Sequence, residues 1–120
     1  MKNICILGST GSIGTQALQV VDFLGDQLNV VGLVAGSNVD LIEKQIEKFD
    51  PDIAALADEA SAELLRTRMK NKRVKILGGQ DGVIQVAAMP EADMALSAIV
   101  GIAGLVPTLE AIKAGKEFDT

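Results

Sequence analysis

Gly8-Ser9-Thr10-Gly11-Ser12-Ile13-Gly14 is the most informative stretch of this 120-residue sequence. It follows a short apolar run, Ile4 to Leu7, and it opens a segment, 13–24, whose apolar residues fall at helical spacing. Gly8 permits a tight turn, Gly11 lets a phosphate approach the backbone, and Gly14 lets the helix pack closely on the sheet. The pattern predicts a phosphate-binding loop; a glycine-rich turn that binds nothing is the disfavoured alternative, because strand and helix flank it.

The donors of this loop suit an anion. The N–H groups at the start of the helix are expected to point at the phosphate, aided by the positive end of the helix dipole. Ser9, Thr10 and Ser12 add hydroxyl groups that can donate to phosphate oxygens.

The rest of the chain alternates strands with helices. This order predicts an α/β fold, a Rossmann-like doubly wound parallel sheet with five strands and short loops. Asn38 or Asp40 is expected to cap the second helix. Strands are expected at 3–7, 30–35, 53–57, 74–77 and 94–99, and helices at 13–24, 41–49, from about Ala62 to Asn71, 82–89 and 105–114.

The tip of the second predicted strand indicates which dinucleotide is bound. NAD-preferring folds carry an acidic residue here for the ribose 2′-hydroxyl. This sequence has Gly36-Ser37-Asn38 instead, and its nearest carboxylate is Asp40. An acid would repel a 2′-phosphate, so the tip favours NADP over NAD. The same residues are also common helix caps, and both roles can hold together.

Composition excludes several classes of function. The chain has no His and one cysteine, Cys5, which removes histidine-dependent catalysis and an internal disulfide. A net charge of −5, with three Phe and no Tyr or Trp, disfavours nucleic acid and anionic membranes as partners. No apolar run approaches the ~20 residues of a membrane span. Met1-Lys2 leads directly into a strand, so we expect no signal peptide and a cytoplasmic location.

Two further segments allow two interpretations each. The basic run from Arg66 to Lys75 is either a patch for a polyanion or, as favoured, a solvated helix end and turn. The small residues of 97–105 either let a ligand approach the sheet edge or pack a loop.

Four segments together resemble the amino-terminal domain of the 1-deoxy-D-xylulose 5-phosphate reductoisomerase family. They are ILGSTGSIGTQ at 6–16, LVAGSNV at 33–39, DEASA at 58–62 and AIVGIAGLVPTLEAIKAGK at 98–116. The resemblance implies an NADPH-dependent enzyme that uses Mg²⁺ or Mn²⁺. It would convert 1-deoxy-D-xylulose 5-phosphate to 2-C-methyl-D-erythritol 4-phosphate in non-mevalonate isoprenoid synthesis.

The resemblance also assigns residues. Thr10, Gly11, Ser12 and Ile13 would hold the pyrophosphate of NADPH. Gly36, Ser37 and Asn38 would hold the adenosine 2′-phosphate, where the family often has Lys or Arg in place of Ser37.

Family members are much longer than this chain. The resemblance therefore implies that residues 1–120 are an NADPH-binding domain with a sixth strand truncated near Thr120. The catalytic residues, the metal ligands, the sugar-phosphate site and the homodimer surface would lie beyond it, so the 120 residues alone would be inactive. The alternatives are a stand-alone nucleotide-binding module and the cofactor domain of another NADP-dependent reductase.

Overall fold

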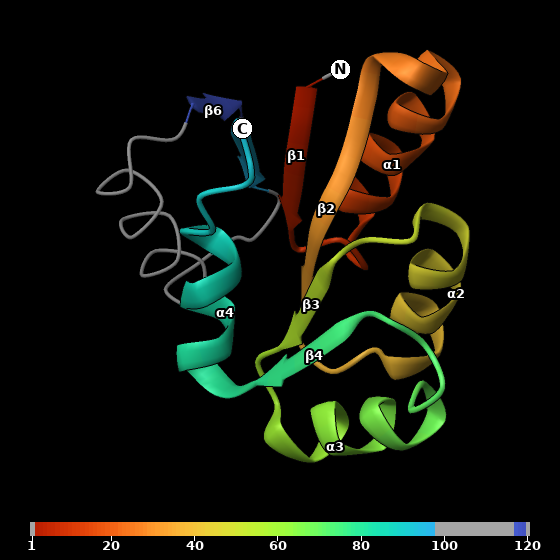
Figure 1. Ribbon diagram of the computed structural model, residues 1–120, viewed down its shortest axis with the longest axis vertical. Helices are drawn as coiled ribbons and strands as arrows, with labels where there is room; N and C mark the ends of the chain where they lie inside the picture. Colours follow the sequence, from red (N-terminus) through yellow and green to blue (C-terminus); the bar gives the residue numbers. More distant parts are fainter. Residues whose placement is uncertain (1, 98–116, 120) are drawn as a thin grey trace.

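A single parallel sheet lies at the centre of the fold (Figure 1). The computed structural model describes residues 2–97 and 117–119. All neighbouring strands are parallel, in the order β4-β3-β2-β1-β5-β6. The strands are β1 (Lys2–Leu7), β2 (Leu28–Ala35), β3 (Ile53–Leu56), β4 (Lys75–Gly78), β5 (Met94–Ser97) and β6 (Glu117–Asp119).

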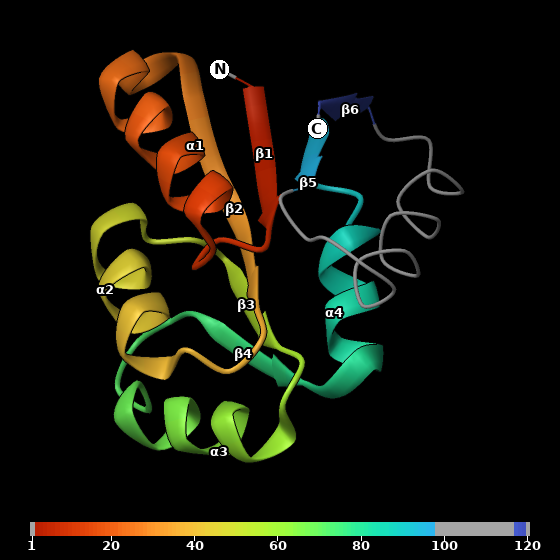
Figure 2. The same ribbon diagram turned by 180° about the vertical axis from the view of Figure 1, so that it is seen from behind.

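Helices cover both faces of this sheet. On one face lie α1 (Ser12–Leu24), α2 (Val39–Phe49) and α3 (Glu59–Arg68), and on the other lies α4 (Gly79–Ala87), as Figure 1 and the reverse view in Figure 2 show. The first three connect strands that step in one direction across the sheet, whereas α4 returns past them to β5. Right-handed crossovers place helices of opposite steps on opposite faces. A short 3₁₀ turn, η1 (Gly25–Gln27), precedes β2.

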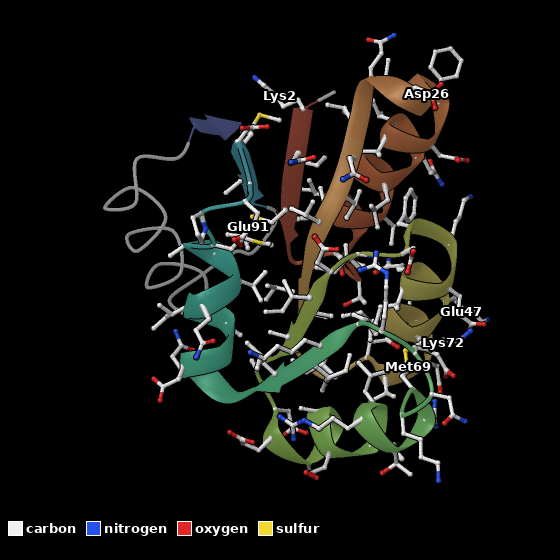
Figure 3. All side chains as sticks on the ribbon, in the orientation of Figure 1. Lys2, Asp26, Glu47, Met69, Lys72 and Glu91 are labelled. Carbon is white, nitrogen blue, oxygen red and sulfur yellow. The ribbon has the colours of Figure 1, made fainter. Side chains whose placement is uncertain are left out.

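The apolar runs form strands because they are buried on both faces. Successive side chains of a strand point to opposite faces. Ile4 and Ile6 face the core under α1 to α3, and Cys5 and Leu7 face the core under α4. Charged side chains such as Glu47 and Lys72 lie on the outside (Figure 3).

The doubly wound parallel fold and its five strands are confirmed, with differences at the boundaries. The third strand ends at Leu56, α3 ends at Arg68, and α4 begins three residues before Gly82. The first residue of this helix, Gly79, has a left-handed φ of 76°. A three-residue sixth strand, β6, pairs with β5. The helix expected at 105–114 lies outside the described residues, as do residues 98 and 99 of the fifth predicted strand.

No helix in the described part of the chain is long and apolar enough to cross a membrane.

Candidate functional site

The loops that follow β1, β2 and β3 meet at the carboxyl edge of the sheet. Ligands of open α/β sheets bind outside this edge. Backbone hydrogen bonds join the three loops into one surface. They run from the N–H groups of Gly8 and Ser9 to Val34 O (2.8 Å each), from Ala57 N to Ala35 O (3.0 Å) and from Asp58 N to Gly36 O (3.1 Å).

Two glycines, Gly8 in the β1–α1 loop and Gly14 in the first turn of α1, are needed for the local fold itself. Gly8 has a φ of 90°, which a side chain rarely adopts. A Cβ at Gly14 would overlap the carbonyl oxygen of Gly8 and lie 2.8 Å from the Gly8 carbonyl carbon. Gly14 therefore lets α1 pack against the turn itself, a closer partner than the sheet that the sequence indicated.

Gly11 is different, because the fold leaves room for a side chain there. It is the N-cap of α1, with an ordinary φ of −77°. A Cβ at this position would lie 3.6 Å from Gly8 O, an ordinary contact. The folded chain thus places no steric demand of its own on Gly11, which is consistent with a glycine kept free for a ligand.

The start of α1 offers donors to the solvent. Thr10 is half-buried, and Gly11, Ser12 and Ile13 are exposed. The first N–H groups of a helix have no partner within it. The first turn of α1 contains no acidic residue, so no carboxylate occupies the positive end of its dipole.

Ser9 does not supply the hydroxyl that the sequence suggested. Its side chain is fully buried, and its Oγ has no hydrogen-bond partner among the described residues. The N–H of Ser9 is engaged with Val34 O. The expectation that Ser9 donates to phosphate is wrong because its side chain is fully buried.

The β2–α2 loop places three exposed residues, Gly36, Ser37 and Asn38, beside the first loop. Asn38 caps α2, since its Oδ1 accepts from the N–H of Leu41 at 3.2 Å. The cap uses the amide oxygen and leaves the amide NH₂ available. At Gly36, a Cβ would meet no atom of the described residues within 4 Å. The cap was one of the two roles expected of this loop, and it is confirmed.

Carboxylates beside this loop are already paired. Asp40 accepts from Arg68 of α3 at 2.7 Å, and this hydrogen bond, with the charge of Arg68, lowers the pKa of Asp40. Asp58 accepts from the Oγ of Ser61 at 2.6 Å and from its N–H at 3.0 Å, which lowers the pKa of Asp58. Arg68 therefore offsets the negative charge that lies closest in sequence to the loop.

A pocket of about 100 Å³ lies at the carboxyl ends of β1, β2 and β3, between them and the start of α4. Its walls come from the ends of β1, β2 and β3 and from the start of α4, and they are mainly apolar. The lining residues are Gly8, Val34, Ala35, Gly36, Ala57, Gln80 and Val83.

Several residues of this site could not be recognised in the sequence. Gln80 and Val83 line the pocket from α4, which no local pattern connects to the loops of β1 and β2. Gln45 of α2 donates from Nε2 to the carbonyl oxygen of Ser9 at 2.8 Å. The one sign of Gln45 in the sequence was that it is a polar residue at a core position of an amphipathic helix.

The contacts of the basic run from Arg66 to Lys75 favour a solvated helix end and turn over a patch for a polyanion. Its arginines bond to neighbouring carboxylates and carbonyl groups, which is what a solvated helix end and turn would do. The contacts run from Arg66 to Glu63 and Ile76 O, from Arg68 to Asp40 and Glu43, and from Arg73 to Asp50 and Asp52.

Within residues 2–97 and 117–119, no group of three or more Cys, Asp or Glu side chains is arranged to hold a metal ion. Most of the small-residue segment 97–105 lies outside those residues.

The sequence of this chain is similar to those of known proteins. A sequence model described as 1-deoxy-D-xylulose 5-phosphate reductoisomerase matches residues 4–119. Proteins of that name from Geotalea uraniireducens and Thermodesulfovibrio yellowstonii are 50% and 48% identical to it, over 98% and 97% of this chain. The chain spans about 30% of the length of these relatives.

Solved structures agree with the sequences. The chain is similar to a DOX-P reductoisomerase in complex with NADPH, fosmidomycin and magnesium, with a TM-score of 0.94 and 30% identity. It is also similar to the Zymomonas mobilis 1-deoxy-D-xylulose 5-phosphate reductoisomerase in complex with NADPH, with a TM-score of 0.92 and 32% identity. Each match covers 98% of this chain and about 30% of the solved one. The chain therefore belongs to the 1-deoxy-D-xylulose 5-phosphate reductoisomerase family.

Proposed function

We propose that residues 1–120 form the NADPH-binding domain of an enzyme that converts 1-deoxy-D-xylulose 5-phosphate to 2-C-methyl-D-erythritol 4-phosphate in non-mevalonate isoprenoid synthesis. One observation carries the proposal: two donor-rich loops, Thr10–Ile13 and Gly36–Asn38, follow β1 and β2 at the carboxyl edge of the sheet, where an apolar pocket is lined by Gly8 and Gly36. Membership of the family and the NADPH held by its solved members support it.

The first loop would hold the pyrophosphate. The donors are the backbone N–H groups of Thr10, Ser12 and Ile13 and the hydroxyls of Thr10 and Ser12, because the N–H of Gly11 already donates to Gly8 O at 3.2 Å. The dipole of α1 adds attraction for an anion at its first turn. The open space at Gly11 allows the phosphate to approach the backbone closely.

The second loop would hold the 2′-phosphate of the adenosine. Its donors are the backbone of Gly36 to Asn38, the Ser37 hydroxyl and the Asn38 NH₂ group. Arg68 reduces the repulsion that Asp40 would otherwise exert on this phosphate. The pocket at the strand ends would receive the adenosine against its apolar walls.

Bound NADPH supplies the hydride for the reductive step. The 120 residues of this proposal bind and orient that cofactor. The sugar-phosphate contacts, the catalytic groups and the Mg²⁺ or Mn²⁺ ligands would come from the part of the longer protein that this chain does not span. The 120-residue chain would have no turnover by itself. The intact protein would be a cytoplasmic homodimer that binds neither nucleic acid nor membrane.

The test is a pair of titrations, NADPH and NADH, by calorimetry on the wild type and two Ser37 variants. Ser37→Lys adds a charge facing the 2′-phosphate. It should tighten NADPH by ~0.5–2 kcal/mol, about 2- to 30-fold, and leave NADH nearly unchanged. Ser37→Asp should weaken NADPH by repulsion and favour NADH, because a carboxylate can accept from the 2′-hydroxyl.

A charge-matched control is available at the opposite end of the sheet. Gln27→Lys adds the same charge in the exposed η1 turn before β2 and should leave both affinities unchanged. If the ratio of NADPH to NADH affinity stays the same in the wild type and both Ser37 variants, the 2′-phosphate does not bind at this loop.

A further inference from the structure

Gln45 joins helix α2 to the first cofactor loop from inside the protein. Its side chain is only 7% exposed and lies on the buried face of α2, between Ile42 and Ile46. Its Nε2 donates to the carbonyl oxygen of Ser9 at 2.8 Å. Ser9, itself fully buried, lies 36 positions away in the sequence.

This hydrogen bond fixes the direction of an N–H group that Gln45 does not touch. The carbonyl of Ser9 and the N–H of Thr10 belong to one planar trans peptide unit, so they point in opposite directions. Because the carbonyl points inward at Gln45, the Thr10 N–H is turned away from α2. The preceding N–H groups, those of Gly8 and Ser9, are held by Val34 O. The Ser9–Thr10 peptide is therefore held by Gln45, and the two peptides before it are held by β2.

We propose that Gln45 is a positioning residue for the cofactor: it holds the Ser9–Thr10 peptide so that the Thr10 N–H faces the pyrophosphate. The inference rests on the proposed function of the loop. Gln45 makes no contact with NADPH in this scheme and acts only through Ser9.

Helix α2 extends this effect to both loops. Its first turn is capped by Asn38 in the second loop, and Gln45, nearly two turns later, reaches the first loop. A ligand that contacts both loops needs the two loops to be held in the correct position relative to each other. A ligand that contacts only the second loop does not depend on Gln45.

The chemistry of the amide explains why a glutamine performs this role. A flipped amide would place Oε1 against the Ser9 oxygen, two acceptors facing each other, so only one orientation is favourable. In this orientation Oε1 is buried and has no partner among the described residues. Methionine has similar length and volume but no donor, which makes Gln45→Met a substitution that removes the hydrogen bond and retains the packing.

The ligand experiment compares two probes by calorimetry and NMR. NADPH spans both loops, and adenosine 2′-monophosphate lacks the pyrophosphate. Gln45→Met should weaken NADPH about tenfold, the effect of losing one well-oriented hydrogen bond, and leave adenosine 2′-monophosphate unchanged. Ile46→Val, a neighbouring core truncation, is the control and should leave both affinities unchanged. Equal weakening of both probes by Gln45→Met, or of neither, overturns the proposal.

A measurement without ligand tests the positioning role of Gln45 independently of the proposed NADPH binding. In Gln45→Met the ¹⁵N–¹H signal of Thr10 should shift and its amide exchange should accelerate, while Ile46→Val leaves both in place. A moved Thr10 signal in a protein that does not bind NADPH would refute the proposed function and retain the positioning role. An unmoved signal refutes the positioning role. If Gln45→Met does not fold, Gln45→Asn, one methylene too short to reach Ser9, replaces it with the same expectations.

Discussion

Gly11 and Gly14 belong to one glycine motif, but Gly11 is the N-cap of α1 and Gly14 lies in its first turn, and they meet different steric constraints. A Cβ at Gly14 meets the backbone of the preceding turn, which cannot move aside cheaply. A Cβ at Gly11 meets only an ordinary contact. The regular spacing of the glycines in the sequence therefore does not show that the fold requires Gly14 and does not require Gly11.

Substitutions should separate the two roles. Gly11→Val should leave a folded domain and abolish measurable NADPH binding, because the branched side chain occupies the space proposed for the pyrophosphate. Gly14→Ala should lower the free energy of unfolding by at least ~1–3 kcal/mol, since its Cβ overlaps the Gly8 carbonyl. Urea unfolding and NADPH titration on each variant give both quantities. A folded Gly11→Val with unchanged affinity would make Gly11 an ordinary turn residue.

The sequence predicts the residues of the cofactor loops better than it predicts the buried residues that hold these loops in place. Gly36, Ser37 and Asn38 could be placed at a strand tip because strand ends and helix caps have local signatures. Ser9 and Gln45 could not be assigned to each other. Helical periodicity shows that position 45 faces the core, but the loop that it reaches depends on how the sheet brings distant segments together.

At the scale of elements, the start of α3 connects helix capping to the second loop. Asp58 caps α3 through Ser61, and its backbone N–H donates to Gly36 O at 3.1 Å. The strands were predictable because a parallel sheet buried on both faces requires continuous apolar runs. Boundaries such as the early start of α4 were not, because the left-handed turn at Gly79 depends on tertiary packing.

The capping carboxylate makes the stability depend on pH. The hydroxyl and N–H of Ser61 hold the pKa of Asp58 below its ordinary value of 3.8. A lowered pKa in the folded state contributes stability that is complete above the unfolded value and is lost as pH falls through the folded one. Asp58→Asn keeps a cap that does not titrate. The stability advantage of the wild type over Asp58→Asn should therefore shrink as pH falls from 6 to below ~3.8. Denaturant midpoints across that range test this, and a constant difference would contradict it.

At the scale of the molecule, strand order creates the site. The chain steps from β1 to β4 in one direction and returns through α4 to β5 on the other side of β1. The strand order therefore reverses direction at β1, whose loop carries Gly8 to Gly11. The alternation of strands and helices predicted that helices cover both faces of the sheet. The order of the strands was not predicted, because it depends on the direction of each crossover.

Binding at such a site should stabilise the whole domain by mass action. A ligand at 100 times its Kd adds ~2.7 kcal/mol to the free energy of unfolding. For a chain of 120 residues, 1 kcal/mol shifts Tm by roughly 3–6 °C, between the values for smaller and larger domains. NADPH at 100 times its Kd should then raise Tm by roughly 8–16 °C. The same concentration of NADH should raise it less, because NADH lacks the 2′-phosphate.

The variants give this thermal shift its controls. Gly11→Val should show no shift with NADPH, because it removes the proposed phosphate approach while leaving the fold. Ser37→Asp should reverse the order of the two cofactors. Circular dichroism melts at several cofactor concentrations measure the effect and should show Tm rising with the logarithm of concentration. Equal shifts from NADPH and NADH on the wild type would show that the domain does not recognise the 2′-phosphate, even if the dinucleotide binds.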